Sequence, residues 1–134
     1  MYRSRRRRFI YFLRSEDRSG LIKIGSSLTR LLPRRISDLR TTSPVPLRLL
    51  AVRAGTIRLE LSIHRQFESL RLHGEWFAPS VELLTYISAI PPNRIVPEIN
   101  AAPFGSWGRW QERAFVTPSA TTSAPPSVPL TEAR

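Results

Sequence analysis

Five side chains suited to phosphate chemistry are spread over the first half of the chain. Tyr11 lies in an apolar run, Lys23 lies in the next apolar run, and Arg35 follows shortly after a proline. Glu60 and His64 stand four residues apart, so a helix would point both at one spot. Phosphodiester hydrolysis needs an oxygen nucleophile, positive charge on the phosphate and neutralisation of the leaving alkoxide, and a metal held by a carboxylate can supply part of this.

A strand–strand–helix unit is predicted around the first three of these residues. The segments 9–14 and 20–25 are rich in aromatic and β-branched residues, and the polar loop between them ends in Gly20, which is typical of an antiparallel hairpin. A helix over 30–40 is expected to begin near Pro33, because proline is well tolerated in a first helical turn.

The following segments predict one more strand and two more helices. The strand covers 47–54, a strongly amphipathic helix covers 57–72, and a last helix over 81–89 follows Ser80 as its N-cap. Gly74 is expected to end the second helix, because glycine suits the left-handed position past a helix end. The predicted fold class is α+β, with a small three-stranded antiparallel sheet flanked by about three helices.

Composition divides the chain into four parts. Residues 1–8 form a basic, flexible arm, and residues 9–90 form the domain. Residues 91–116 contain prolines and tryptophans without a clear period, and the sequence leaves their packing open. Residues 117–134 are nearly all Pro, Ser, Thr and Ala and are expected to be disordered, since they offer little to bury. The chain contains no cysteine, which excludes disulfides and thiolate zinc sites.

The charge of the chain points to a polyanion as its partner. Lys and Arg number 21 against 10 Asp and Glu, giving a net charge of +11. The plain alternative is a compositional bias toward arginine. We expect DNA as the partner, with contacts from arginines of the arm and of the first helix: Arg5, Arg6, Arg7, Arg8, Arg34 and Arg40.

Membrane insertion and secretion are not indicated by the sequence. No run approaches the ~18 to 20 consecutive apolar residues of a membrane helix. The apolar run after the arginine cluster is too short for a signal peptide and is followed by acidic residues. We therefore expect a cytoplasmic protein with no membrane partner and no small-molecule cofactor.

The order and spacing of several short motifs resemble the GIY-YIG nuclease superfamily. The motifs are Ile10-Tyr11, Lys23-Ile24-Gly25, Arg35, Glu60 with His64, and Gly74-Glu75-Trp76-Phe77. The resemblance covers roughly residues 9–88 and is to the branch with a KIG second motif and a GEWF-like ending, frequent in phages and bacteria. Phe9 stands where the first motif has Gly, and Lys23 replaces the Tyr of the second motif. Glu75 is interpreted as a structural residue of its loop.

The resemblance implies a metal-dependent DNA endonuclease. Tyr11 would help to activate water, Arg35 would steady the phosphate, and Glu60 would hold Mg²⁺ or Mn²⁺. Lys23 would bond to Tyr11, lower its pKa or contact the phosphate, while His64 is either a second base or a histidine at the core edge with a backbone partner. These residues are expected to share one water-accessible hollow. The alternatives are a catalytically inactive DNA-binding module on the same fold, and a basic protein whose motifs match by coincidence.

Overall fold

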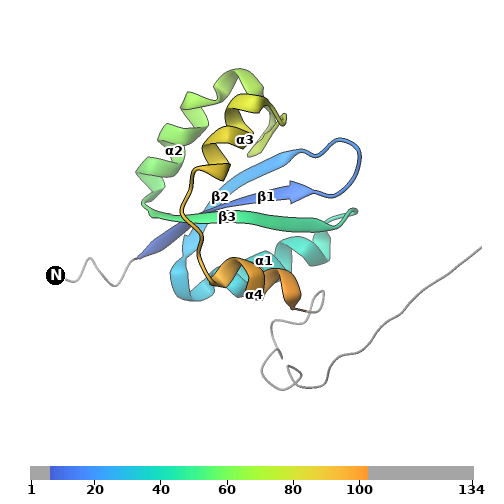
Figure 1. Ribbon diagram of the computed structural model, residues 1–134, viewed down its shortest axis with the longest axis vertical. Helices are drawn as coiled ribbons and strands as arrows, with labels where there is room; N and C mark the ends of the chain where they lie inside the picture. The colour runs from blue at the N-terminus through green and yellow to red at the C-terminus, as the bar shows by residue number, and fades with distance from the viewer. Residues whose placement is uncertain (1–6, 103–134) are drawn as a thin grey trace, which may run out of the picture.

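A computed structural model of the chain describes residues 7–102 (Figure 1). Within this range an antiparallel sheet of five strands lies between two layers of helices, so the expected α+β class is confirmed. The expectations for Arg5 and Arg6, for residues 103–116 of the extension and for the tail over 117–134 fall outside the described residues. None of the helices between residues 7 and 102 is long and apolar enough to cross a bilayer.

The three predicted strands are neighbours in the sheet. β1 (Arg8–Ser15) pairs antiparallel with β2 (Ile22–Leu28) on one side and with β3 (Leu47–Gly55) on the other. Tyr11 of β1 stands opposite Gly25 of β2. The hairpin and the third strand are therefore confirmed, and β1 includes Arg8, which we expected in the flexible arm.

The predicted helix over 57–72 is wrong in its second half. The segment divides into three elements: α2 (Ile57–Gln66), a 3₁₀ turn (Glu68–Leu70) and β4 (Arg71–His73). Gly74, with φ 58°, makes the turn from β4 into β5 (Trp76–Phe77) and does not end a helix. The strand order is β3-β1-β2-β5-β4, so the sheet has two strands more than predicted.

Two further helices agree with the sequence patterns. A 3₁₀ turn (Thr29–Leu31) leads into α1 (Leu32–Thr42), which has Pro33 in its first turn. α3 (Val81–Ser88) begins after Ser80, whose hydroxyl accepts the amide of Leu83 and so caps the helix.

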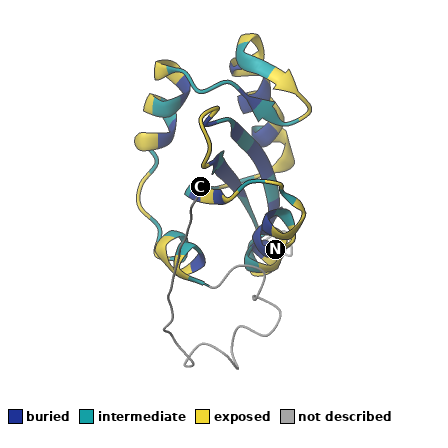
Figure 2. Ribbon diagram, turned by 90° about the vertical axis from the view of Figure 1, so that its right-hand side faces the viewer, coloured by how far each residue is buried: buried dark blue, intermediate teal, exposed yellow. Residues whose placement is uncertain are grey.

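The sheet buries apolar residues on both of its faces (Figure 2). Residues of β1, β2, α2 and α3 form the core on one face, among them Ile10, Phe12, Ile24, Ile63, Phe67 and Leu83. Residues of β1, β3, α1 and α4 form the core on the other face, among them Tyr11, Leu13, Val52, Leu32, Ile36 and Ile99. Alternate residues of β1 therefore point into different cores, as the period of a strand requires.

α4 (Ile95–Ala101) packs against β3 and lies beyond residue 90, where we expected the domain to end. Ile99 of this helix is fully buried. The Asn100 side chain accepts the Leu49 amide at 2.9 Å and donates to the Leu49 carbonyl at 2.9 Å. The packed unit therefore continues into the extension, at least to the end of the described residues.

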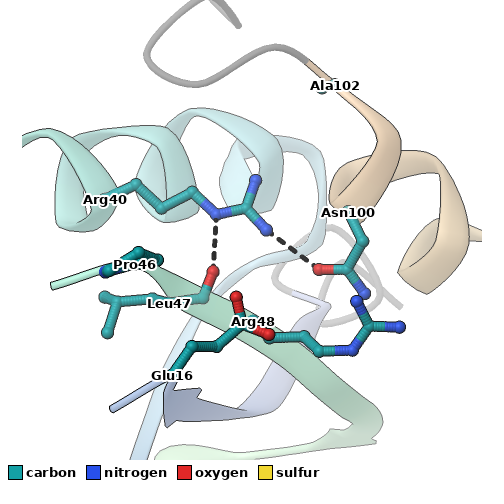
Figure 3. A pocket seen from close by; sticks show the side chains of 7 residues that line it. All are labelled: Glu16, Arg40, Pro46, Leu47, Arg48, Asn100 and Ala102. Carbon is teal, nitrogen blue, oxygen red and sulfur yellow. Dashed lines mark hydrogen bonds between the residues drawn. The ribbon is translucent and has the colours of Figure 1, made fainter. Parts of the chain in front are cut away.

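Arg40 is buried, and this corrects the expectation that it contacts nucleic acid. Its guanidinium donates to the Leu47 carbonyl oxygen at 3.1 Å and to Asn100 Oδ1 at 2.9 Å (Figure 3). It also donates to the Ile99 carbonyl oxygen at 3.0 Å. Burial lowers the pKa of Arg40. The side chain is only 7% exposed and ties α1 to β3 and α4, so it is not available to a phosphate.

Candidate active site

The candidate site lies at the edge of β2 where the short strand β5 ends. β5 pairs with β2 only at Ile22 and Lys23, and the carbonyl of Glu75 then accepts the Ile24 amide at 3.0 Å. Within residues 7–102, the rest of β2 pairs with β1 alone. Side chains from both faces of the sheet can therefore meet around this edge.

α2 brings Glu60 and His64 to one face of β2. The Thr56 side chain caps the helix, Glu60 lies in its first turn and His64 lies one turn later. His64 Nε2 is 2.9 Å from the Ile24 carbonyl oxygen and 3.6 Å from Glu60 Oε2. A carbonyl oxygen can only accept, so Nε2 carries a hydrogen and donates it to Ile24. Of the two readings of His64, the structure therefore shows the histidine with a backbone partner.

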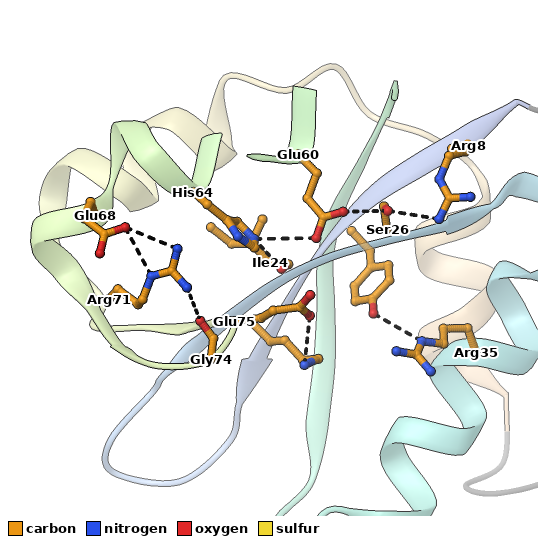
Figure 4. Close-up of polar contacts among 12 residues, drawn as sticks. Arg8, Ile24, Ser26, Arg35, Glu60, His64, Glu68, Arg71, Gly74 and Glu75 are labelled. Carbon is orange, nitrogen blue, oxygen red and sulfur yellow. Dashed lines mark hydrogen bonds and ion pairs between the residues drawn. The ribbon is translucent and has the colours of Figure 1, made fainter. Parts of the chain in front are cut away.

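Ser26 binds the other oxygen of Glu60 and Arg8 binds Ser26, and neither role was predicted from the sequence. The Ser26 hydroxyl donates to Glu60 Oε1 at 2.7 Å and accepts from Arg8 Nη2 at 3.2 Å (Figure 4). Arg8 Nε is buried and has no hydrogen-bond partner among the described residues. The usable signal was strand period, because Ser26 follows Ile22 and Ile24 on the same face of β2.

Glu75 completes a cluster of three groups able to bind a cation. One ligand atom from each of Glu60, His64 and Glu75 lies within 4.8 Å of the others. The side chains of Glu60 and His64 are 9% and 6% exposed, whereas that of Glu75 is 38% exposed. Glu75 therefore forms the solvent side of the cluster, a position that its interpretation as a loop residue did not foresee. The turn at Gly74 brings it to β2, and no local pattern indicates that pairing.

Lys23 is directed at Glu75 in the structure. Its ammonium lies 3.1 Å from Glu75 Oε1 and 5.5 Å from the centre of the Trp76 ring. Among the described residues, the side-chain hydrogen bond of the Tyr11 hydroxyl comes from Arg35 and not from Lys23. The expected bond from Lys23 to Tyr11 is therefore not formed.

Tyr11 and Arg35 meet on the opposite face of the sheet. Arg35 Nε donates to the Tyr11 hydroxyl at 3.4 Å, a long bond. Burial raises the pKa of Tyr11, while Arg35 lowers it and the charges of Glu75 and Glu60 raise it further. The phenol and Arg35 therefore lie across the sheet from Glu60 and His64, with the backbone of β2 between the two sets.

The expected water-accessible hollow is wrong for Tyr11. Its side chain is 0% exposed, because the ring packs in the core beneath α1. Arg35 is exposed, and it joins the phenol to the solvent side of the site. Arg34 and Arg7, two of the predicted nucleic-acid contacts, are also exposed and remain accessible to a phosphate.

The donor set of the cluster fits a hard divalent cation. Carboxylates are the ligands that Mg²⁺ and Mn²⁺ prefer, and an imidazole is also acceptable to Mn²⁺. The His64 nitrogen that faces Glu60 donates its hydrogen to Ile24 and has no lone pair free for a cation, so Glu60 and Glu75 are the two candidate ligands in this arrangement. In comparisons with known proteins, no family model, curated protein or solved structure matches the chain.

Proposed function

We propose that the protein is a DNA endonuclease of the GIY-YIG type, which hydrolyses phosphodiesters with Mg²⁺ or Mn²⁺. The observation that carries this proposal is the meeting of two sets of groups around the edge of β2. Glu60, His64 and Glu75 form a cluster within 4.8 Å, and the Tyr11–Arg35 pair lies within the field of the two carboxylates. Such a combination of acids, a guanidinium and a phenol is suited to phosphate hydrolysis.

Each residue has a distinct part in this proposal. Glu60 and Glu75 would hold the dication, which when bound polarises the phosphate and its attacking water. The exposed Arg35 guanidinium binds phosphate oxygens, for which its planar set of donors is suited. His64 holds α2 on β2 through its bond to Ile24.

In this proposal Tyr11 is the base that accepts a proton from the attacking water, and its buried environment opposes that role. As the water oxygen bonds to phosphorus and the P–O ester bond breaks, Tyr11 accepts the proton of the water only if its phenol is already ionised, and the leaving alkoxide takes up a proton from solvent. Burial raises the pKa of Tyr11, so the phenolate is scarce at neutral pH, and the bond from Arg35 offsets part of this. Water must reach the hydroxyl from the side of Arg35, because the ring is otherwise enclosed.

A DNA substrate is supported by the charge of the chain. The net charge is +11, and phosphate contacts dominate the affinity of proteins for nucleic acid. Two further arginines close to Arg35 in sequence are exposed: Arg30 in the turn before α1 and Arg34 in α1.

The second candidate function is a DNA-binding module without catalytic activity. Two observations favour it: Tyr11 is completely buried, and Lys23 forms an ion pair where the second motif of the resembled family has a tyrosine. In this case the basic surface would bind DNA while the buried phenol serves only the core.

A plasmid-nicking assay separates the two candidates. Purified protein is incubated with supercoiled DNA and Mn²⁺ or Mg²⁺, with EDTA as the metal-free reaction, and a gel-shift assay measures binding. We expect the wild type to nick, Glu60→Ala to bind without nicking, and Glu68→Ala to do both. Glu68 is the matched control, since it is an exposed acid paired with Arg71 outside the cluster.

Two outcomes of these assays would contradict the proposed function. Binding without nicking in either metal would support the inactive module and overturn the endonuclease. Nicking that survives both Glu60→Ala and EDTA would show that the reaction does not use this cluster.

A further inference from the structure

A positive side chain of the protein already occupies the solvent side of the cluster. The Lys23 ammonium lies 3.1 Å from Glu75 Oε1, and Glu75 is the most exposed of the three residues of the cluster. Lys23 is the only lysine of the 134-residue chain. The carboxylate through which a dication from solvent would first be bound is therefore paired with an internal cation.

The position of the ammonium is fixed by the sheet. Lys23 and Trp76 are direct partners across β2 and β5, and the ammonium lies 5.5 Å from the centre of the indole ring. The Lys23 side chain is 13% exposed, so its aliphatic part is largely covered. The backbone bond from the Ile24 amide to the Glu75 carbonyl brings Glu75 to β2 next to Lys23, so the fold places the two charged residues side by side.

We propose that Lys23 competes with the divalent cation for Glu75, and so weakens metal binding until it is displaced. This inference rests on the proposed metal site. A carboxylate oxygen that is paired with an ammonium attracts a dication less strongly. The ammonium also repels a dication that lies beside it. Metal binding therefore requires the ammonium to leave Glu75. The freed ammonium is then available to a DNA phosphate at the same edge of β2.

The test is a calorimetric titration of the full chain with MnCl₂. The wild type is compared with Lys23→Met, which keeps the aliphatic chain over Trp76 and removes the charge. We expect Lys23→Met to bind Mn²⁺ about fivefold more tightly, the factor that corresponds to the loss of one partly exposed ion pair. Arg18→Met is the control for net charge, since Arg18 lies in the exposed loop between β1 and β2, and we expect its affinity to equal that of the wild type.

A double-mutant cycle shows whether Lys23 acts through Glu75. In the Glu75→Gln background we expect Lys23→Met to raise the Mn²⁺ affinity clearly less than it does with Glu75 present, because only the direct repulsion between ammonium and dication is then removed. An affinity that falls or stays the same in Lys23→Met overturns the competition while leaving the metal site intact. An equal gain in the Glu75→Gln background also overturns it, because the effect would then be long-range charge alone. If neither the wild type nor Lys23→Met binds Mn²⁺, the metal site and the proposed endonuclease fail together.

Discussion

Tyr11 and Gly25 face each other across β1 and β2 so closely that a Cβ on Gly25 would lie 2.5 Å from the Tyr11 hydroxyl oxygen. The phenol therefore lies against the backbone of β2 at Gly25, where a side chain would block it. The same hydroxyl then meets Arg35 on α1. The glycine of the second motif thus sets the position of the tyrosine of the first.

Gly25→Ala should destabilise the protein by about 1 to 3 kcal/mol, the usual cost of overpacking a core. The new methyl group would contact the hydroxyl and ring carbons of a fully buried Tyr11, which has little room to move. Urea denaturation measures the change. In a Tyr11→Ala background the same substitution should cost clearly less, and an equal cost in both backgrounds would show that the ring is not the obstacle.

The pKa of Tyr11 predicts how stability depends on pH in alkali. Burial raises this pKa, so the folded protein holds the phenol proton more firmly than the unfolded chain does. The resulting stability is fully present below the unfolded value of about pH 10 and is lost as the pH rises through the folded pKa. Between about pH 9.5 and 11.5 the free energy of unfolding should therefore fall more steeply in the wild type than in Tyr11→Phe. The free energy of unfolding is measured by urea denaturation at each pH. If it falls equally with pH in the wild type and in Tyr11→Phe, the phenol is solvated.

Ser26→Ala should lower the affinity for Mn²⁺ by about 10- to 100-fold, as is usual when a group that orients a metal ligand is lost. The Ser26 hydroxyl donates to Glu60 Oε1 at 2.7 Å, and without it the carboxylate is free to turn. Ser27→Ala is the matched control, because the Ser27 hydroxyl donates to the Leu28 carbonyl at 2.8 Å and not to the cluster. Calorimetric titration with MnCl₂ compares the three proteins. An equal loss of Mn²⁺ affinity in Ser26→Ala and Ser27→Ala would show that Ser26 does not orient Glu60.

Arg35 and Arg34 should differ in what their loss affects. Arg35→Met should reduce nicking more than binding, because Arg35 touches Tyr11 at the proposed site of reaction. Arg34→Met should leave the nicking of bound DNA unchanged and weaken binding alone, lowering the slope of log affinity against log salt by about 1. Gel shifts over a salt series, combined with nicking at saturating protein, measure both effects. If Arg34→Met reduces nicking and Arg35→Met weakens binding alone, then Arg34 and not Arg35 contacts the phosphate at the site of reaction.

Arg40→Met should destabilise the protein by about 2 to 3 kcal/mol, because hydrogen bonds from a charged group to buried acceptors are lost. The acceptors left behind are the carbonyls of Leu47 and Ile99 and the Asn100 amide. Arg48→Met, at an exposed position in the same pocket, should change the stability by less than about 0.5 kcal/mol. Gel-shift affinity per folded molecule should be equal in Arg40→Met and the wild type, which would separate this residue from DNA binding.

The strands and helices with strong local patterns could be predicted from the sequence. The two apolar runs around a polar loop gave β1 and β2, and Ser80 marked the start of α3. The end of α2 could not be read in this way, because Leu70 continues its apolar spacing although β4 begins at the next residue. A strand of three residues, and a helix as short as α4 with Pro97 inside it, give no period to detect.

In the candidate site, contacts between residues close in sequence could be predicted, whereas contacts between distant residues could not. Glu60 and His64 could be paired from their spacing on one helix. Ser26 could not be connected to Glu60, which lies 34 residues away, without knowing which face of β2 meets α2. The burial of Arg40 was equally hidden, since arginine is mostly an exposed residue and its acceptors come from two segments distant from it in sequence, β3 and α4.

The Asn100 amide meets both backbone groups of Leu49 on β3, the strand that ends the sheet on its side. The Asn100 side chain thereby makes the pair of hydrogen bonds that a further strand would make. It occupies backbone groups of the edge strand that could otherwise pair with another chain. A protein cut short before α4 would lose these hydrogen bonds. It would present β3 to its own copies and be prone to self-association through added strands, even with every group of the proposed nuclease site in place.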